Sequence, residues 1–322
     1  LYTYLINIIG RFFMNKVDNE FNLIINEIKN SSYEELLGKI KLNFLCLPYI
    51  YQHSLEEYFK KYKFWGSLDH AIGAFDEIEK KAKMLKNHYK DIVWLYNKLS
   101  DYFSKFILLA VLKNYLYYDF VSLDKASDKK YKHYFDLDLV PNFNNATIVD
   151  VGAYTGDSIL DFVDTYGAKS YKKAYCYEIT LEVLEQMKGN LSKLSNIIYK
   201  NKAVKNKNGR VFLDENGDLS SNRTSRRGGL PLECVSLDGD IKDKIDLIKM
   251  DIEGDELSAL KGAKKHIEQD SPVLLISIYH KNEHLWQIAK FISSVNKNYK
   301  YFLRYYGGNL YPTELVLFAI KK

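Results

Sequence analysis

The residues best placed to do chemistry follow a short hydrophobic run, Thr147–Val151, which has the composition of a buried strand. Gly152 and Gly156 then form a G-x-x-x-G turn that leads directly into a helical stretch. Gly152 permits a tight turn, and Gly156 lets a ligand come close to the start of the helix. Asp150 and Asp157 beside the turn would repel a pyrophosphate but attract a ligand with a positively charged amino-acid end. S-adenosylmethionine is such a ligand, and the spacing differs from the G-x-G-x-x-G pattern of dinucleotide-binding turns.

An acidic residue follows the second predicted strand, Lys173–Tyr177. Glu178 lies 178 − 156 = 22 residues after Gly156, where a sheet of this kind carries an acid that binds a ribose. A carboxylate there can accept hydrogen bonds from both ribose hydroxyls. An acidic residue at the end of a strand is often only exposed to solvent. The assignment of Glu178 to ribose binding therefore depends on the glycine turn formed by Gly152 and Gly156.

Four carboxylates follow the fourth predicted strand, Ile245–Met250, at the sheet edge where ligands bind in open α/β folds. We interpret Asp251 as functional and Glu253 as a candidate for binding the substrate. Asp255 and Glu256 are interpreted as structural, because acidic residues stabilise the start of a helix.

A histidine, His280, follows the fifth predicted strand, Val273–Ile278. An unperturbed imidazole has a pKa near ~6.5 and is largely neutral in the cytoplasm, so His280 is the candidate general base for removing a hydroxyl proton. Asp251 could orient that imidazole, bind the acceptor hydroxyl or hold a divalent ion that acidifies it. No spacing of histidine and acidic residues identifies a metal site, so a divalent metal stays an open alternative. A lone histidine is also commonly structural.

A basic stretch, Ser220–Gly229, lies between the third and fourth predicted strands. It contains Arg223 and Arg226 among hydroxyl residues and glycines, a composition that suits a flap gripping phosphate. A nucleotide-linked sugar carries a diphosphate, so we expect such an acceptor; the alternative is a solvated loop. Arg304, in the predicted strand Tyr299–Tyr305, is a further candidate for substrate binding at the same rim.

The elements that must position these residues alternate between strands and helices from about residue 145 onward. Alternation of this kind predicts parallel βαβ units and an α/β doubly wound sheet. The remaining predicted elements are helices over Ser158–Tyr166, Leu181–Leu191, Glu256–Ile267 and Leu285–Ser294, a strand over Asn196–Tyr199, and a closing antiparallel pair of Tyr299–Tyr305 with Leu315–Ile320.

The chain before this region has a helical pattern. Ser32 and Glu35 have the spacing of a capping box at the start of a helix. With 322 residues, about two domains are expected. We predict a helical N-terminal or cap region over residues 1–125 and a cofactor-binding domain over residues 126–322. One helical face is formed by Phe21, Ile24, Ile25 and Ile28.

The composition is that of an ordinary globular protein, with 47% hydrophobic and 27% charged residues. A formal net charge of +5 does not by itself indicate a nucleic-acid partner. Three scattered cysteines without a CxxC motif favour a reducing, cytoplasmic compartment. Leu1–Met14, which Arg11 interrupts, and Phe106–Leu112 both fall short of the ~20 apolar residues of a membrane span, so no membrane span is expected.

Together these motifs resemble the FkbM-type S-adenosylmethionine-dependent methyltransferases, over a stretch from about Tyr96 to Ile320. Asp255 departs from the family pattern, in which small residues are common at that position. The matching segments are VDVGAYTGDS (149–158), YEIT (177–180), NKAV (201–204), DLIKMDIEGDELSALKGA (246–263), SIYHKNEHLW (277–286) and YFLRYY (301–306).

The resemblance implies a seven-stranded, Rossmann-like methyltransferase sheet. It also implies methyl transfer to hydroxyls of sugars or other natural products, often in polysaccharide or glycan assembly. Glu178 would then bind the ribose of S-adenosylmethionine, and Ala203 would lie near its adenine. The residues expected around the methionine part of the cofactor are Asp150, Gly152, Tyr154, Gly156 and Asp157.

Other functions stay open beside this one. A nucleic-acid methyltransferase is disfavoured because the fourth strand lacks a Pro-aromatic signature and its acidic end would repel phosphates. A non-catalytic scaffold is disfavoured by the intact acidic residues, and a nicotinamide-linked oxidoreductase by the glycine spacing. We predict an O-methyltransferase that acts on a sugar hydroxyl, with a nucleotide-activated sugar for capsule or other surface-polysaccharide synthesis as acceptor. The N-terminal helices could join copies of the chain into a homo-oligomer.

Overall fold

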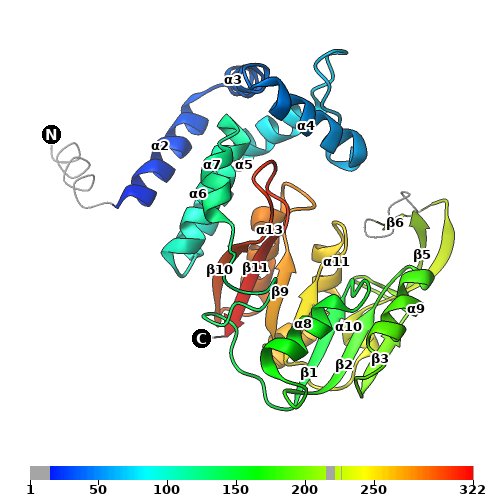
Figure 1. Ribbon diagram of the computed structural model, residues 1–322. Helices are drawn as coiled ribbons and strands as arrows, with labels where there is room; N and C mark the ends of the chain where they lie inside the picture. The colour runs from blue at the N-terminus through cyan, green and yellow to red at the C-terminus, as the bar shows by residue number, and fades with distance from the viewer. Residues whose placement is uncertain (1–14, 215–221, 226, 322) are drawn as a thin grey trace. The chain divides into compact units, whose positions relative to one another are not determined.

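The computed structural model describes residues 15–214, 222–225 and 227–321, and Figure 1 labels its helices and strands. The sequence-based predictions for Leu1–Met14 and Arg226 lie outside the described residues. The chain divides into two compact units, each built from segments that are distant in sequence. The boundary predicted between residues 125 and 126 stays a prediction. The first unit comprises the described residues up to Asp128 with Lys281–Trp286 and Phe302–Leu315, and the second comprises Lys129–His280, Gln287–Tyr301 and the chain from Val316 onward.

The first unit is mainly helical, as the pattern of the N-terminal region predicts. Its first described helix buries the predicted apolar face of Phe21, Ile24, Ile25 and Ile28. The second begins with the predicted capping box, in which the Ser32 hydroxyl accepts from the Glu35 backbone N–H and the Glu35 carboxylate accepts from the Ser32 N–H. Among the described residues, no helix has the length and apolar character to cross a membrane. The helices are α2 (Lys16–Asn30), α3 (Tyr33–Leu45), α4 (Tyr49–Lys61), the short η1 (Lys63–Trp65), α5 (Asp76–Lys98), α6 (Tyr102–Tyr117) and α7 (Phe120–Ala126).

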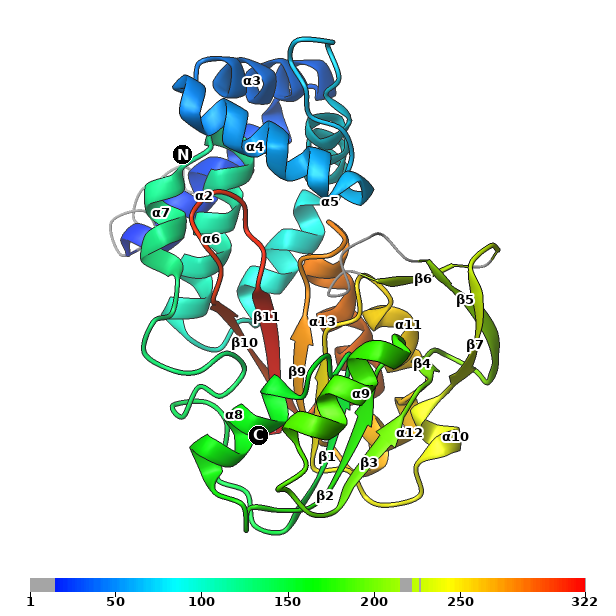
Figure 2. The ribbon, with the colours of Figure 1, turned by 45° about the vertical axis from the view of Figure 1, so that its right-hand side comes forward.

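A seven-stranded sheet in the order β10-β11-β9-β8-β1-β2-β3 belongs mostly to the second unit, with β10 from Phe302 onward and Leu315 of β11 counted in the first (Figure 2). β1 pairs in parallel with β2 and β8, β2 with β3, and β8 with β9, whereas β11 runs antiparallel to β9. The predicted doubly wound α/β sheet is therefore confirmed. Its strands are β1 (Ala146–Val151), β2 (Tyr171–Tyr177), β3 (Ile197–Lys200), β8 (Leu247–Met250), β9 (Val273–Ser277), β10 (Tyr299–Tyr305) and β11 (Leu315–Lys321).

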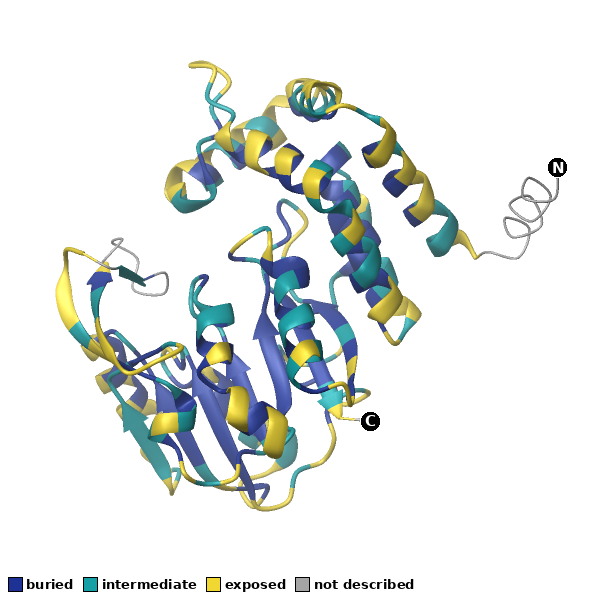
Figure 3. Ribbon diagram, turned by 180° about the vertical axis from the view of Figure 1, so that it is seen from behind, coloured by how far each residue is buried: buried dark blue, intermediate teal, exposed yellow. Residues whose placement is uncertain are grey.

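Helices cover both faces of this sheet. α8 and α9 lie on the face of the sheet that is toward the viewer in Figure 1. α13 lies on the opposite face, which is toward the viewer in Figure 3. The single helix predicted over Glu256–Ile267 is wrong, because it is divided at Gly262. A Cβ there would lie 2.0 Å from the carbonyl oxygen of Lys205, so the backbone packs against a neighbouring segment at this point. The helices are α8 (Asp157–Tyr166), α9 (Leu181–Asn190), α10 (Leu237–Asp240), α11 (Glu256–Lys261), α12 (Lys264–Gln269) and α13 (His284–Val295).

A second, four-stranded sheet in the order β4-β7-β5-β6 was not predicted. The interpretation of Ser220–Gly229 as a loop is wrong for Arg223–Ser225, which forms β6 and pairs antiparallel with β5. Arg223, Thr224 and Ser225 are paired with Asp214, Leu213 and Phe212 of β5, the preceding strand. The strands are β4 (Ala203–Val204), β5 (Gly209–Asp214), β6 (Arg223–Ser225) and β7 (Leu230–Val235).

The register of the large sheet determines where the chain leaves it. Val151 of β1 is paired with both Tyr177 of β2 and Met250 of β8, and Met250 is paired with Ile276 of β9. β1, β8 and β9 are buried along their whole length, so the sheet centre is fixed by packing on both faces (Figure 3). The segments after these strands therefore begin at one level along the same edge.

Candidate active site

The turn after β1 depends on a close approach of two backbones. Gly152 has φ +75°, and a Cβ on it would lie 1.9 Å from the carbonyl oxygen of Asp251. The Asp251 N–H in turn donates to the Val151 carbonyl at 3.0 Å. Gly156 also has a positive φ, +86°, and the side chain of Leu191 fills the space beside its Cα. Both glycines are therefore required by the packing of the turn, and Gly152 joins the end of β1 to the end of β8.

Asp150 anchors this turn from inside the protein. Its carboxylate oxygens lie 3.0 Å from Lys249 Nζ and 2.6 Å from the donating Ser158 hydroxyl. Lys249 Nζ also donates to the Gly152 carbonyl at 2.7 Å. Burial raises the pKa of Asp150, although Lys249 and Ser158 oppose that effect. Lys249 was not predicted as a site residue, although a lysine inside the apolar run Ile245–Met250 is the signal that could have identified it.

Glu178 lies at the end of β2 with its carboxylate turned toward the first turn. One oxygen accepts from the Tyr154 backbone N–H at 3.0 Å, and the other accepts from the Thr180 N–H at 2.8 Å. Burial raises the pKa of Glu178 above its usual value, although hydrogen bonds from the two N–H groups oppose this effect. The ends of β1 and β2 thus bring Glu178 to the glycine turn, as the spacing predicted.

The other predicted cofactor residues lie around this turn or just beyond it. Tyr154 is exposed and has φ +45°. Asp157 is exposed in the first turn of α8, and Ala203 is buried in β4, where it is paired with Cys234 of β7. The structure therefore gives Asp157 a position open to a ligand and gives Ala203 a place in the smaller sheet.

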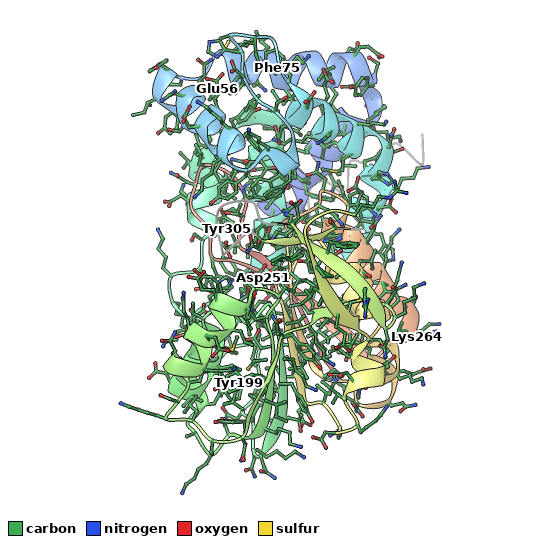
Figure 4. The ribbon with its side chains drawn as sticks, turned by 90° about the vertical axis from the view of Figure 1, so that its right-hand side faces the viewer. Glu56, Phe75, Tyr199, Asp251, Lys264 and Tyr305 are labelled. Atoms are coloured by element: carbon green, nitrogen blue, oxygen red, sulfur yellow. The ribbon has the colours of Figure 1, made fainter. Side chains whose placement is uncertain are left out.

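A second group of side chains follows β8 and β9 and is centred on His280. His280 Nε2 lies 3.3 Å from Asp251 Oδ1 and 3.3 Å from Glu253 Oε1. His280 Nδ1 lies 2.8 Å from Glu256 Oε1. Figure 4 labels Asp251 in this region of the second unit. We call Asp251, Glu253, Glu256 and His280 the carboxylate–histidine cluster.

Glu256 is a central member of this cluster. Its side chain is fully buried, and its Oε1 accepts from the backbone N–H groups of Ile252 and Gly254 as well as contacting His280. The sequence analysis interpreted Glu256 as structural. The hydrogen bonds that Glu256 accepts from the backbone agree with a structural role. Its contact with His280 could not be predicted from the sequence, because 24 residues separate Glu256 from His280.

The charges in the cluster determine the protonation of His280. Burial lowers the pKa of His280, but Glu256 and Glu253 outweigh this and raise the pKa well above its usual value. Burial raises the pKa of Asp251 against the opposing effect of His280, whereas His280 and Arg223 overcome burial and lower the pKa of Glu253. The pKa of His280 therefore differs from that of the unperturbed imidazole assumed from the sequence, and the raised pKa favours the protonated ring. The general-base role of His280 stays a prediction that requires the loss of that proton.

Tyr134 is a residue of this site that the sequence analysis missed. Its hydroxyl donates to Asp251 Oδ2 at 2.7 Å and lies 3.1 Å from the Ser277 hydroxyl. Tyr134 has φ +71° and is buried in a turn-rich segment before β1. No motif pointed to it, because the contact joins residues that are 117 positions apart.

The predicted substrate-binding arginines lie in different places. Arg223, in β6, contacts Glu253 Oε2 through Nη2 at 2.9 Å and so joins the cluster. Arg304 belongs to the first unit, where Nη2 lies 3.0 Å from Asp101 Oδ2 and Nη1 donates to the Leu303 carbonyl. The structure thus brings Arg223 to the cluster and gives Arg304 partners within the first unit.

Comparisons with known proteins give the family of this region. The family model described as the methyltransferase FkbM domain matches residues 150–305. The crystal structure of methyltransferase FkbM from Methylobacillus flagellatus KT is similar, with 22% identity, a TM-score of 0.64 and coverage of 83% of this chain and 70% of that chain. An rRNA methylase from Streptococcus thermophilus is a more distant match, with 12% identity, a TM-score of 0.38 and coverage of 56% of this chain and 89% of that chain. No curated protein matches the chain.

The similarity to the Methylobacillus structure shows a shared fold, and the family match covers the glycine turn, Glu178 and the carboxylate–histidine cluster. The resemblance inferred from the sequence motifs is thereby confirmed. Residues 150–305 of this chain match the family model of the methyltransferase FkbM domain.

Proposed function

We propose that this chain is an S-adenosylmethionine-dependent O-methyltransferase that acts on a sugar hydroxyl. The observation that carries the proposal is the placement of two groups along one edge of the sheet. The glycine turn with Glu178 follows β1 and β2, and the carboxylate–histidine cluster follows the adjacent β8 and β9. The first group suits a cofactor with a ribose and a cationic end, and the second suits a hydroxyl that must lose a proton.

The proposed binding of S-adenosylmethionine depends on carboxylates near the glycine turn that can accept hydrogen bonds. Glu178 is held by the Tyr154 and Thr180 N–H groups, and each carboxylate oxygen has a further lone pair for a ribose hydroxyl. Asp157, exposed at the start of α8, offers a carboxylate to the methionine ammonium. Asp150 contributes indirectly, because its bonds to Lys249 and Ser158 maintain the turn.

Methyl transfer requires little covalent chemistry from the protein. The methyl carbon forms a bond to the acceptor oxygen as its bond to sulfur breaks, and sulfur keeps the electron pair to give S-adenosylhomocysteine. The hydroxyl proton must leave, and we propose that the Asp251 carboxylate accepts it as the new carbon–oxygen bond forms. Protonated His280 and Tyr134 hold Asp251 in place. Positioning of this kind is a large part of catalysis for an in-line displacement.

The second part of the proposal concerns which class of molecule accepts the methyl group. The FkbM resemblance implies sugar hydroxyls, and a pair of carboxylates suits a polyol because it offers several acceptors to neighbouring hydroxyls. Arg223, which contacts Glu253 of the cluster, would bind the diphosphate of a nucleotide-activated sugar. Such an acceptor places the reaction in the cytoplasm, in the synthesis of a surface polysaccharide.

The test begins with cofactor binding. We would check the purified protein for bound cofactor by mass spectrometry and titrate it with S-adenosylhomocysteine by calorimetry. We expect one-to-one binding, followed by transfer of a labelled methyl group to a nucleotide sugar in an acceptor screen. A folded, cofactor-free sample that does not bind S-adenosylhomocysteine would contradict the proposed function.

A further inference from the structure

Three side chains of the carboxylate–histidine cluster have the arrangement of metal ligands. Among the residues that the structure describes, Asp251, Glu253 and His280 form one group whose donor atoms all lie within 4.8 Å of one another. Asp251 and Glu253 follow β8, and His280 follows β9, its parallel neighbour. They therefore lie in the short segments that directly follow two adjacent strands of the buried sheet, which brings them to one place.

The distances within this group are long for charge-assisted hydrogen bonds and match the spacing of ligands around a shared cation. A charge-assisted N–H···O bond is about 2.7–2.9 Å long. His280 Nε2 instead lies 3.3 Å from Asp251 Oδ1 and 3.3 Å from Glu253 Oε1. Ligand atoms that are each about 2.0–2.2 Å from one metal ion are separated by roughly 3.0–3.4 Å when they are neighbours in its coordination shell. Both separations fall within that interval.

Each of the three ligands is also oriented by a partner on its other side. Asp251 presents Oδ1 to Nε2 while its Oδ2 accepts from the Tyr134 hydroxyl at 2.7 Å. Glu253 presents Oε1 while its Oε2 contacts Arg223 at 2.9 Å.

The imidazole is oriented in the same way. His280 presents Nε2 while its Nδ1 contacts the fully buried Glu256 at 2.8 Å. A carboxylate on the second nitrogen of a histidine, and hydrogen bonds on the outer oxygens of carboxylates, are the arrangement found around metal ligands in proteins.

We propose that Asp251, Glu253 and His280 bind one divalent transition-metal cation, with Glu256, Tyr134 and Arg223 orienting them. One imidazole nitrogen and two carboxylate oxygens suit ions such as Mn²⁺ or Zn²⁺. The cation would lie between Nε2 and the two carboxylate oxygens. Three protein ligands leave coordination positions for water or an acceptor oxygen, as in catalytic metal sites.

The use of this cation in catalysis rests on the proposed function, but its binding does not. A hydroxyl coordinated to the cation would lose its proton more readily than a free hydroxyl, because the positive charge stabilises the alkoxide. The experiment therefore measures metal binding and S-adenosylhomocysteine binding separately on the same protein.

The test is a titration of chelator-treated full-length protein with Mn²⁺, in which electron paramagnetic resonance measures the free ion. We expect one bound Mn²⁺ per chain. His280→Ala and Asp251→Asn should each weaken binding by at least about 100-fold. Glu256→Gln keeps the acceptor oxygen but removes the charge behind the imidazole, and should weaken binding about 10–100-fold.

The control is His266→Asn, which removes a second partly buried histidine whose Nδ1 lies 2.7 Å from the Asp270 carboxylate. This variant should bind Mn²⁺ like the unsubstituted chain, and circular dichroism verifies that every variant is folded. Mn²⁺ bound equally well by the His280 and Glu256 variants would overturn the proposal, as would no saturable binding by a folded protein. Mn²⁺ binding without S-adenosylhomocysteine binding would support the metal site while contradicting the proposed function.

Discussion

Two charged side chains near the glycine turn, Asp150 and Lys249, are buried as a pair, and this pairing determines what each contributes. Asp150 and Lys249 are both almost fully buried and lie 3.0 Å apart. Burial lowers the pKa of Lys249, but Asp150 and Asp251 outweigh it and raise that pKa. Removal of one partner leaves the other charge buried without its counter-ion, which costs more than the pair itself contributes.

Asp150→Asn should therefore lower the free energy of unfolding by about 3–5 kcal/mol, measured by urea denaturation. Binding of S-adenosylhomocysteine should weaken as well, because the turn loses its anchor. The double variant Asp150→Asn, Lys249→Met should recover part of the stability, since the uncompensated charge is then gone. A loss below about 1 kcal/mol for the single variant would show that the pair is not buried in solution.

His70 provides a pH-dependent prediction in the first unit. The imidazole bonds to the Glu56 carboxylate, which raises its pKa above the usual value. A group with a raised folded-state pKa contributes fully below its unfolded pKa of about 6.5 and loses that contribution as pH rises through the folded value. An NMR titration of the His70 ring should give a midpoint above pH ~6.5, and Glu56→Gln should return it to about that value. A titration midpoint at or below pH ~6.5 in the unsubstituted chain would contradict the contact between His70 and Glu56.

At the scale of elements, the turns that join strands to helices show why local motifs were predictable. The strand, glycine turn and helix of Thr147–Tyr166 occupy one continuous segment, so composition and spacing were enough to identify them. The sheet formed by β4 to β7 was missed, because β4 has only two residues, β6 has only three, and β4 pairs with β7, a strand about 30 positions later. Tyr134 and the contact between Glu256 and His280 were missed for the same reason, since only the folded sheet brings them together.

A pair of glycine substitutions tests the turn after β1. Gly152→Ala should reduce stability by at least about 2 kcal/mol and abolish S-adenosylhomocysteine binding, because φ is +75° and the new Cβ would meet the Asp251 carbonyl. Gly189→Ala is the matched control, since nothing lies within 4 Å of a Cβ at that helical position. The control should raise stability by about 0.5–1 kcal/mol. Thermal melts and calorimetry give both quantities, and equal behaviour of the two variants would contradict the close approach.

At the scale of the whole molecule, the two units should respond separately to substitution. Arg304 contacts Asp101, Ser104 and the Leu303 carbonyl within the first unit. Arg304→Gln should lower the free energy of unfolding by about 1.5–3 kcal/mol, because charge-assisted hydrogen bonds are lost. Its affinity for S-adenosylhomocysteine, measured by calorimetry, should stay within twofold of the unsubstituted chain. A normal unfolding free energy combined with a raised KM for the sugar acceptor would instead favour the substrate role predicted from the sequence.

The parallel pairing of β1 with β8 also has a consequence for the order of synthesis. Ile148 is paired with Leu247, and these residues are 247 − 148 = 99 positions apart. A ribosome adds roughly 5–20 residues per second, so β8 emerges about 5–20 s after β1. During that interval β1 can pair with β2, but its other edge, destined for the centre of the sheet, has no strand beside it. The nascent chain therefore carries an apolar, unpaired edge for seconds, and this is the stage at which a chaperone would be of most use to it.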